Sequence, residues 1–168
     1  MSLAAAGDYS TAEKMLCKIN EQCYKDDMNY CTWLARCKIM NGNAPEAWKM
    51  YSSNLIDRDC RIPFLKVFAD DCFRSKQFLE AMKAFDALQK LQLEEGDSAD
   101  YSLGLKSAFI GVFRSVVLEK VAEKRVSMKG KAVLIEASNI IQQGGHTAAE
   151  DLKRTLITIK LWTKKNIS

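Results

Sequence analysis

The sequence predicts an all-α protein, a right-handed helical solenoid of stacked helix pairs with C-terminal capping helices. Three observations predict it. Similar segments recur at a nearly constant spacing, a turn signal precedes each recurrence by five positions, and apolar residues follow a helical period along the chain. A helix pair cannot cover its own apolar stripe, so neighbouring pairs must stack to bury it.

The recurrence is clearest at small residues that begin the second helix of each pair. Ala12, Ala47 and Ala81 stand 35 and then 34 positions apart. Each is followed four positions later by a large residue, in order Leu16, Tyr51 and Phe85. A small side chain lets two helices approach closely, so we expect all three alanines to face the core.

The turn inside each pair is predicted at Gly7, Gly42 and Lys76, where the chain must leave one helix and enter the next. The first helix before the opening turn is reduced to residues 3–6, so we expect about two and a half pairs over residues 1–93. This predicts a fragment of a longer array, in which another chain could complete the half repeat.

Two local signals agree with these helix starts. Ser10 and Glu13 stand three positions apart, as in a capping box, and Pro45 fits a first helical turn. We therefore predict that these helices begin just after the turns.

The C-terminal part, residues 94–168, loses the period and is predicted to form a cap of about three helices packed on the repeats. A polar loop is expected over 94–98, followed by a helix from about Tyr101 to about Ala122 with an apolar stripe at Phe109, Ile110, Phe113, Val116, Val117 and Val121. A second helix should stop at the glycine pair 144–145 and carry an apolar stripe at Val133, Leu134, Ala137, Ile140 and Ile141. A third begins at Thr147, with Leu152, Leu156, Ile159 and Trp162 on one face.

Composition favours a soluble, folded chain with a cytosolic or ciliary type of compartment. The 168 residues are 48% hydrophobic and 27% charged, and no apolar run approaches the length of a membrane span. The net charge of +4 is too small for a nucleic-acid footprint. We expect no nucleic-acid partner and no membrane insertion.

The cysteines and the histidine do not form a chemical motif. Structural zinc sites use closely spaced ligand pairs, whereas the spacing here is six residues between Cys17 and Cys23 and between Cys31 and Cys37. His146 is the one available base, and it follows two glycines in a predicted turn. We therefore predict no enzyme activity, no metal and no cofactor, with the thiols reduced and packed in the core.

The period and the small-then-aromatic pattern resemble the tetratricopeptide repeat family. Ala47 with Tyr51 and Ala81 with Phe85 match that family's second helix. The departures are an alanine in place of the usual first-helix glycine, at Ala35 and Ala69, and Lys76 at a turn. The resemblance implies a protein-binding solenoid.

A longer segment is more specific: Trp33-Leu34-Ala35-Arg36-Cys37-x-Ile39-Met40-Asn41, followed by Ala47-Trp48 and Tyr51. Further matching runs lie at 69–73, 77–78, 81–86, 111–113 and 159–164. This pattern resembles the intraflagellar transport protein 56 family, tetratricopeptide subunits of intraflagellar transport complex B, in its C-terminal region.

That resemblance implies a non-enzymatic interaction module in cilium or flagellum assembly and in transport of motility cargo. It implies a location in the cilium or flagellum, the basal body and the cytoplasm. The implied partners are other complex B subunits, among them intraflagellar transport protein 46, and ciliary motility cargo proteins.

The concave side of such a stack is lined by first helices, which predicts a partner-binding set of Asn29, Thr32, Arg36, Lys66 and Asp70. Two other functions stay open. A generic tetratricopeptide adaptor or co-chaperone is one, and a helical-repeat RNA-binding protein is the other. RNA binding would require a strongly basic concave face, whereas these helices mix Arg36 with acidic residues.

Overall fold

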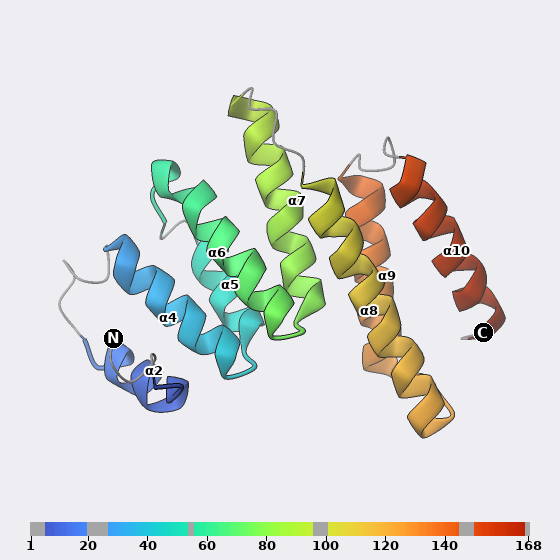
Figure 1. Ribbon diagram of the computed structural model, residues 1–168, viewed down its shortest axis with the longest axis horizontal. Coiled ribbons are helices and arrows are strands. Elements are labelled where there is room, and N and C mark those ends of the chain that lie inside the picture. The colour runs from blue at the N-terminus through green and yellow to red at the C-terminus, as the bar shows by residue number, and fades with distance from the viewer. Residues whose placement is uncertain (1–5, 20–26, 54–55, 96–100, 145–149, 167–168) are drawn as a thin grey trace. The chain divides into compact units, whose positions relative to one another are not determined.

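The computed structural model describes residues 6–19, 27–53, 56–95, 101–144 and 150–166. The chain divides into two compact units, Met1–Glu80 and Ala81–Ser168. Every regular element in the described ranges is helical, which confirms the predicted all-α class (Figure 1). Helix α7, Phe78–Glu95, begins in the first unit and continues into the second. The predicted division after Leu93 stays a prediction.

The first unit is built from helices that stack around one central helix. Its complete elements are α2 (Tyr9–Cys17), α4 (Met28–Met40), α5 (Ala44–Ser52), the short 3₁₀ turn η1 (Arg58–Cys60) and α6 (Arg61–Arg74). Helix α4 packs against α2, α5 and α6. Helices α4 and α5 form a hairpin, and α6 begins the next pair, as the tetratricopeptide-like prediction requires (Figure 1).

The three recurrent alanines lie in the core, as predicted. Ala12 is 8% exposed, and Ala47 and Ala81 are 0% exposed. Burial of a methyl group at the same place in each repeat lets the paired helices approach closely. The spacing of the sequence therefore has a direct structural cause.

The three predicted turn positions share one backbone conformation. Gly7, Gly42 and Lys76 have φ angles of 85°, 83° and 62°, all in the left-handed region. After the turn, the backbone N–H of Gln77 donates to the Cys72 carbonyl at 2.9 Å, and the backbone N–H of Asn43 donates to the Lys38 carbonyl at 2.8 Å. Lys76 adopts this conformation although its Cβ makes it costly.

The side chain of Gln77 joins two successive turns. Its Nε2 donates to the Ile39 carbonyl at 2.6 Å, and its Oε1 accepts from the Ala44 amide at 2.8 Å. The Ile39 carbonyl lies in the last turn of α4 and also accepts from the Gly42 backbone N–H, and the Ala44 backbone N–H is the first of α5. Gln77 therefore fixes one repeat to the turn of the preceding one.

Helix α2 begins just after the turn at Gly7, as predicted, but its cap is not the expected residue. Asp8, not Ser10, is the N-cap residue, and its Oδ1 accepts from the Thr11 amide at 3.1 Å. Asp8 directly follows Gly7, whose backbone is left-handed. The negative charge of the Asp8 carboxylate also interacts favourably with the positive N-terminal end of the helix dipole. The capping-box prediction at Ser10 is wrong, whereas Pro45 does lie in the first turn of α5, as predicted.

Aromatic side chains fill the space between α5 and α6. Phe64 and Phe68 are 1% and 2% exposed, with ring centroids 5.9 Å apart. Trp48 lies 5.6 Å from Phe68, and Tyr51 stacks on Phe64. Trp48 is half-buried, so only part of its side chain lies in the core.

The second unit contains α8 (Ser102–Glu123), α9 (Met128–Gln143) and α10 (Glu150–Asn166) after α7. Helix α8 contacts both α9 and α10. Lys106 reaches Asp151 at 3.1 Å and Lys120 reaches Asn166 at 2.7 Å, so α8 and α10 run parallel. The partners are 45 and 46 positions apart, against 35 for the pair Arg36 and Asp71 in the first unit.

This longer spacing explains why the period vanishes from the sequence. Helices α8 and α9 contain 22 and 16 residues, whereas α4 and α5 contain 13 and 9. The sequence separation between contacting residues on two parallel helices is therefore about ten residues longer in the second unit, 45 instead of 35. The arrangement of α8, α9 and α10 repeats that of α4, α5 and α6.

The predicted apolar stripes of this unit are mostly correct. Phe109 and Val116 in α8 are buried, as are Leu134 and Ile141 in α9 and Leu152, Leu156 and Ile159 in α10. Ile110 and Val121 are wrong, because they are 44% and 75% exposed. The predicted start at Thr147 lies outside the described residues.

Candidate protein-docking site

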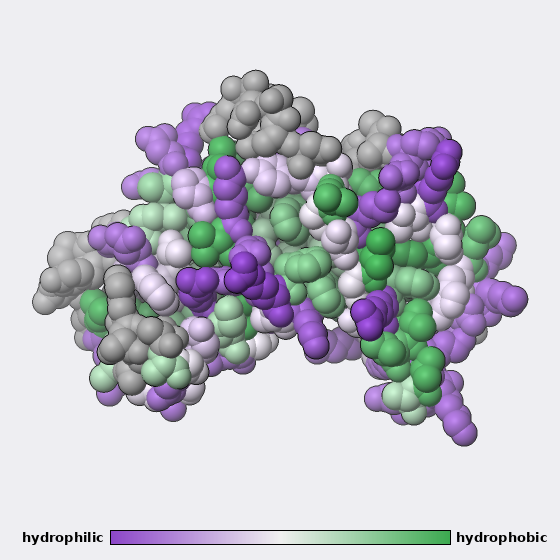
Figure 2. Space-filling view, viewed as in Figure 1, coloured by the Kyte–Doolittle hydropathy of each residue, from purple (hydrophilic) through white to green (hydrophobic). Residues whose placement is uncertain are grey.

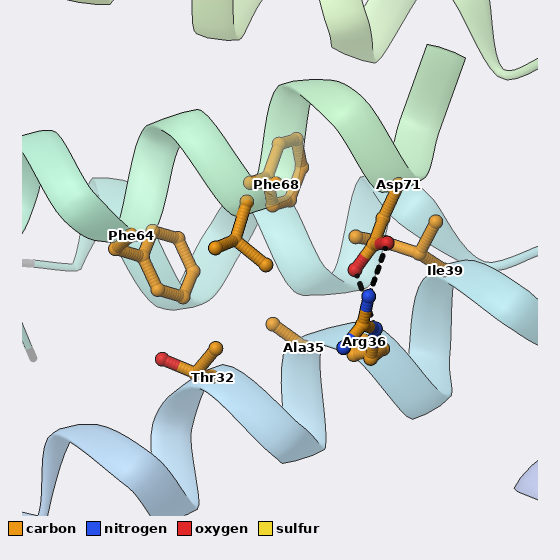
Figure 3. A pocket seen from close by; sticks show the side chains of 8 residues that line it. Thr32, Ala35, Arg36, Ile39, Phe64, Phe68 and Asp71 are labelled. Carbon is orange, nitrogen blue, oxygen red and sulfur yellow. Dashed lines mark hydrogen bonds and ion pairs between the residues drawn. The ribbon is translucent and has the colours of Figure 1, made fainter. Parts of the chain in front are cut away.

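A shallow pocket lies between α4 and α6 in the first unit. Thr32, Ala35, Arg36 and Ile39 come from α4, and Phe64, Val67, Phe68 and Asp71 come from α6 (Figure 3). Both sets run in the same order along their helices, so α4 and α6 are parallel. The pocket holds no water-sized empty space, so it is a furrow between packed side chains.

Arg36 and Asp71 close one end of this furrow. Arg36 Nη2 donates to Asp71 Oδ1 at 3.0 Å, and Arg36 Nε lies 2.9 Å from Oδ2 (Figure 3). The second contact is an ion pair without hydrogen-bond geometry, so Oδ2 has no hydrogen-bond donor in the described residues. The Asp71 side chain is 1% exposed and that of Arg36 is 35% exposed.

Burial dominates the chemistry of this carboxylate. Desolvation raises the pKa of Asp71 above its ordinary value, although the hydrogen bond and charge of Arg36 work in the opposite direction. The guanidinium therefore offsets only part of the cost of burying the charge. The pair is held by surrounding packing as much as by its own attraction.

Arg36 is also fixed by a ring. Its guanidinium carbon lies 5.5 Å from the centroid of half-buried Trp33, within the range of a cation–π contact. One edge of the guanidinium faces Asp71, and a third of the side chain stays in water. A partner polypeptide can therefore meet a charged group that is already held in place.

Only part of the predicted partner-binding set lines the furrow. Thr32 and Arg36 do, although the Thr32 hydroxyl donates to the Met28 carbonyl at 2.8 Å. Asn29 is exposed near the start of α4, where its backbone N–H donates to the capping carboxylate of Asp27. Lys66 is exposed, and Asp70 is exposed and paired with Arg74 at 3.0 Å.

On α6 the furrow uses the residue after each predicted one. Val67 lies in it where Lys66 was predicted, and Asp71 lies in it where Asp70 was predicted. One residue turns a helix by about 100°, so adjacent positions face different sides. The signal that could have identified Asp71 is its separation of 35 from Arg36, which equals the repeat.

The thiols are mainly structural. Cys31, Cys37 and Cys72 are buried, as predicted, and burial raises the pKa of the Cys37 and Cys72 thiols. The core prediction is wrong for Cys17, which is exposed, and Cys60 is half-buried. Cys23 and His146 lie outside the described residues.

The described side chains do not bring metal ligands together. Within the described ranges, no group of three His, Cys, Asp or Glu residues could hold a metal ion. The furrow itself offers a paired guanidinium and carboxylate, a hydroxyl that is already bonded, and apolar surface. Of these groups, Val67 and the outer part of Arg36 are exposed, so they are the ones that a polypeptide can contact.

None of the described helices is both long and apolar enough to cross a membrane.

Comparison with known proteins gives a family match and several curated relatives, one of which is described here. The family model described as intraflagellar transport protein 56 matches residues 1–167. A Caenorhabditis elegans protein described as an intraflagellar transport protein 56 homolog is 28% identical over 130 residues, which cover 77% of this chain and 22% of that relative. The chain thus spans about a fifth of the relative's length. No solved structure matches it.

Proposed function

This chain belongs to the intraflagellar transport protein 56 family, and from that premise we propose that it is a non-enzymatic protein-docking part of intraflagellar transport complex B. In this role it would act in the assembly of the cilium or flagellum and in the transport of motility cargo. The observation that carries the proposal is the family match over nearly the whole chain, residues 1–167.

The architecture supports a docking role. Stacked helix pairs hold side chains on broad surfaces, and such surfaces bind proteins without a reactive residue. In the first unit the furrow between α4 and α6 combines apolar Val67, 37% exposed, with the fixed guanidinium of Arg36. Both groups are typical of protein interfaces.

The partners that we propose are other complex B subunits, with intraflagellar transport protein 46 as the direct one, and ciliary motility cargo proteins. The proposed contact residues are Thr32 and Arg36 in the furrow, with Asn29, Lys66 and Asp70 on the exposed sides of the same two helices. The proposed locations are the cilium or flagellum, the basal body and the cytoplasm.

Affinity recovery from ciliated cells tests this function. The tagged chain is used as bait, and bound proteins are identified by mass spectrometry. Recovery of complex B subunits supports the proposal. Recovery of chaperones without any transport subunit contradicts it and favours a general tetratricopeptide adaptor. Recovery that depends on intact RNA contradicts it in favour of an RNA-binding protein.

The contact residues are tested by substitution in the same experiment. Arg36 is left unchanged, because its loss would expose a buried carboxylate and disturb the fold. Lys66→Glu is used instead, because Lys66 is exposed and its side chain makes no ion pair or hydrogen bond among the described residues. Lys153→Glu, at an exposed position of α10, is the matched control. Weaker recovery with Lys66→Glu alone supports the proposed contact residues on α4 and α6, and equal recovery contradicts that assignment.

A further inference from the structure

The outward face of α8 carries a regular stripe. Its positions alternate in steps of four and three residues, and they are Leu103, Ser107, Ile110, Arg114, Val117 and Val121. This is the a and d spacing of a helix that pairs with another helix through three heptads. At about 1.5 Å per residue the stripe is roughly 27 Å long.

The stripe faces away from the core of its unit. Leu103, Ile110 and Val121 are 73%, 44% and 75% exposed. The opposite side of the same helix holds Leu105 and Phe109, which are 1% and 0% exposed. In Figure 2 hydrophobic surface recurs along α8, with hydrophilic groups between. Helix α8 therefore has two apolar sides, and only one of them is used inside the unit.

A single charge stands in the middle of the stripe. Arg114 is exposed, and in the described part of the chain it has no ion pair or hydrogen bond through its side chain. The neighbouring cations on the flank toward α10 are already engaged, Lys106 with Asp151 and Lys120 with Asn166. The face thus presents apolar side chains around one available guanidinium.

We propose that this stripe docks an amphipathic helix of a partner protein, whose apolar seam has heptad spacing and carries a carboxylate opposite Arg114. A carboxylate matches a guanidinium in charge and can accept two parallel hydrogen bonds from it. The proposal rests on the docking function above and adds the face and the chemistry of the partner. A charged residue at a core position of a helix pair also fixes register and partner choice.

A second copy of this chain fits the stripe poorly. Parallel pairing of two α8 helices in register sets Arg114 against Arg114, and antiparallel pairing about the centre sets it against Ile110. Either pairing buries a guanidinium without a carboxylate, which is costly. The stripe therefore favours a different polypeptide.

A membrane surface fits poorly as well. Helices that lie in a bilayer interface carry cations on the polar face and keep the apolar face free of charge. Here the cation lies on the central line of the apolar face. Insertion would drive the guanidinium toward the deepest point, so the charge pattern favours a protein helix.

Binding of two synthetic peptides to the whole chain tests the proposal. Both peptides are helical and three heptads long, with leucine at the seam, and they differ only at the central seam position, which is Glu in one and Lys in the other. We expect the Glu peptide to bind about tenfold more tightly, because like charges across an interface are strongly unfavourable. Fluorescence anisotropy measures both affinities.

Variants of the chain locate the binding. Arg114→Glu should reverse the preference between the two peptides, and Leu103→Lys with Val121→Lys should weaken both by about tenfold or more. Ile135→Lys on α9, where Ile135 is 59% exposed, is the matched control and should change nothing. All four side chains are exposed, so circular dichroism should show the same helicity for each variant.

Three results would overturn the proposal. They are equal binding of the Glu and Lys peptides, a preference that Arg114→Glu leaves unchanged, and equal loss with Ile135→Lys. Dimerisation of the chain that Leu103→Lys abolishes would replace it with self-pairing, and binding to phosphatidylserine vesicles that Arg114→Glu abolishes would replace it with a membrane site. The recovery of complex B subunits is scored separately, so failure of the proposed function gives a different result from failure of the stripe.

Discussion

Arg36 and Asp71 stand 35 positions apart and close an ion pair between corresponding helices of two neighbouring repeats. The separation equals one repeat, so the contact reports directly on the register of the stack. Because Asp71 is almost fully buried and Arg36 is not, the two ends of the pair differ in what their loss would do.

Replacement of Arg36 by alanine should lower the free energy of unfolding by about 2–3 kcal/mol. Breaking a fully buried ion pair lowers the free energy of unfolding by more than this, because one charge is left buried and unpaired. Here a third of the Arg36 side chain is in water, which weakens the pair and reduces the loss. Urea denaturation measures the change.

The double variant Arg36→Met with Asp71→Leu is the control for this first prediction. It removes both charges and keeps apolar volume, so it should recover most of the lost stability. If Arg36→Ala alone changes the free energy of unfolding by less than about 0.5 kcal/mol, the pair does not hold the repeats together.

Gln77→Ala should destabilise the first unit by about 1–2 kcal/mol, because it removes a donor to Ile39 O and an acceptor for the Ala44 amide in a half-buried turn. Thermal unfolding followed by circular dichroism measures the effect. Gln142→Ala is the control, since Gln142 makes an exposed bond within its own helix. Equal shifts in both variants would show that Gln77 does not clamp the turns.

Lys76→Gly should raise the stability by about 0.5–1 kcal/mol. Lys76 has a φ of 62°, where its Cβ is strained, and glycine removes that strain at some cost in the entropy of the unfolded chain. Gly42→Ala, at φ 83° with open space around it, should do the reverse. Chemical denaturation compares the two, and a loss of stability with Lys76→Gly would contradict the common turn geometry.

Two carboxylates should give opposite pH dependence. The pKa of Asp71 is raised by burial from its ordinary 3.8, so the folded state holds the proton more tightly. Its contribution to stability therefore falls as pH rises from 3.8 toward the raised value. The pKa of Glu13 is lowered from 4.5, because hydrogen bonds from Lys38 and Asn41 outweigh its burial. Its contribution is present above 4.5 and is lost as pH falls through the lowered value.

Unfolding free energies of Asp71→Asn and Glu13→Gln, measured against the unsubstituted chain from acid to neutral pH, check these signs. The advantage of the unsubstituted chain over Asp71→Asn should shrink as pH rises. The advantage over Glu13→Gln should grow. Slopes of the same sign would contradict the electrostatic account of one of the two sites.

The repeat could be predicted from the sequence because it depends on local chemistry. Ala47 must be small where helices cross, and Gly42 must adopt a left-handed backbone. Even Lys76 was identified as a turn, since position in the repeat carried more information than residue type. The spacing of equivalent residues was sufficient for the first unit.

The sequence could not predict which of two adjacent residues, or which of two apolar faces of one helix, is buried. Asp70 and Asp71 are both acidic neighbours, and only the packed structure decides which one faces Arg36. Ile110 and Val121 look like core residues because α8 is apolar on two sides, and periodicity cannot tell which side the unit buries. The parallel pairing of α8 with α10 was hidden by helix lengths that differ from those of the first unit.

Sedimentation velocity tests the proposed docking role most directly, with the fluorescently labelled chain mixed with purified intraflagellar transport complex B that was prepared without it. We predict that the labelled boundary moves to the sedimentation coefficient of the complex and that this shift saturates with complex concentration. A label that keeps the sedimentation coefficient of the free chain at every concentration would contradict the account.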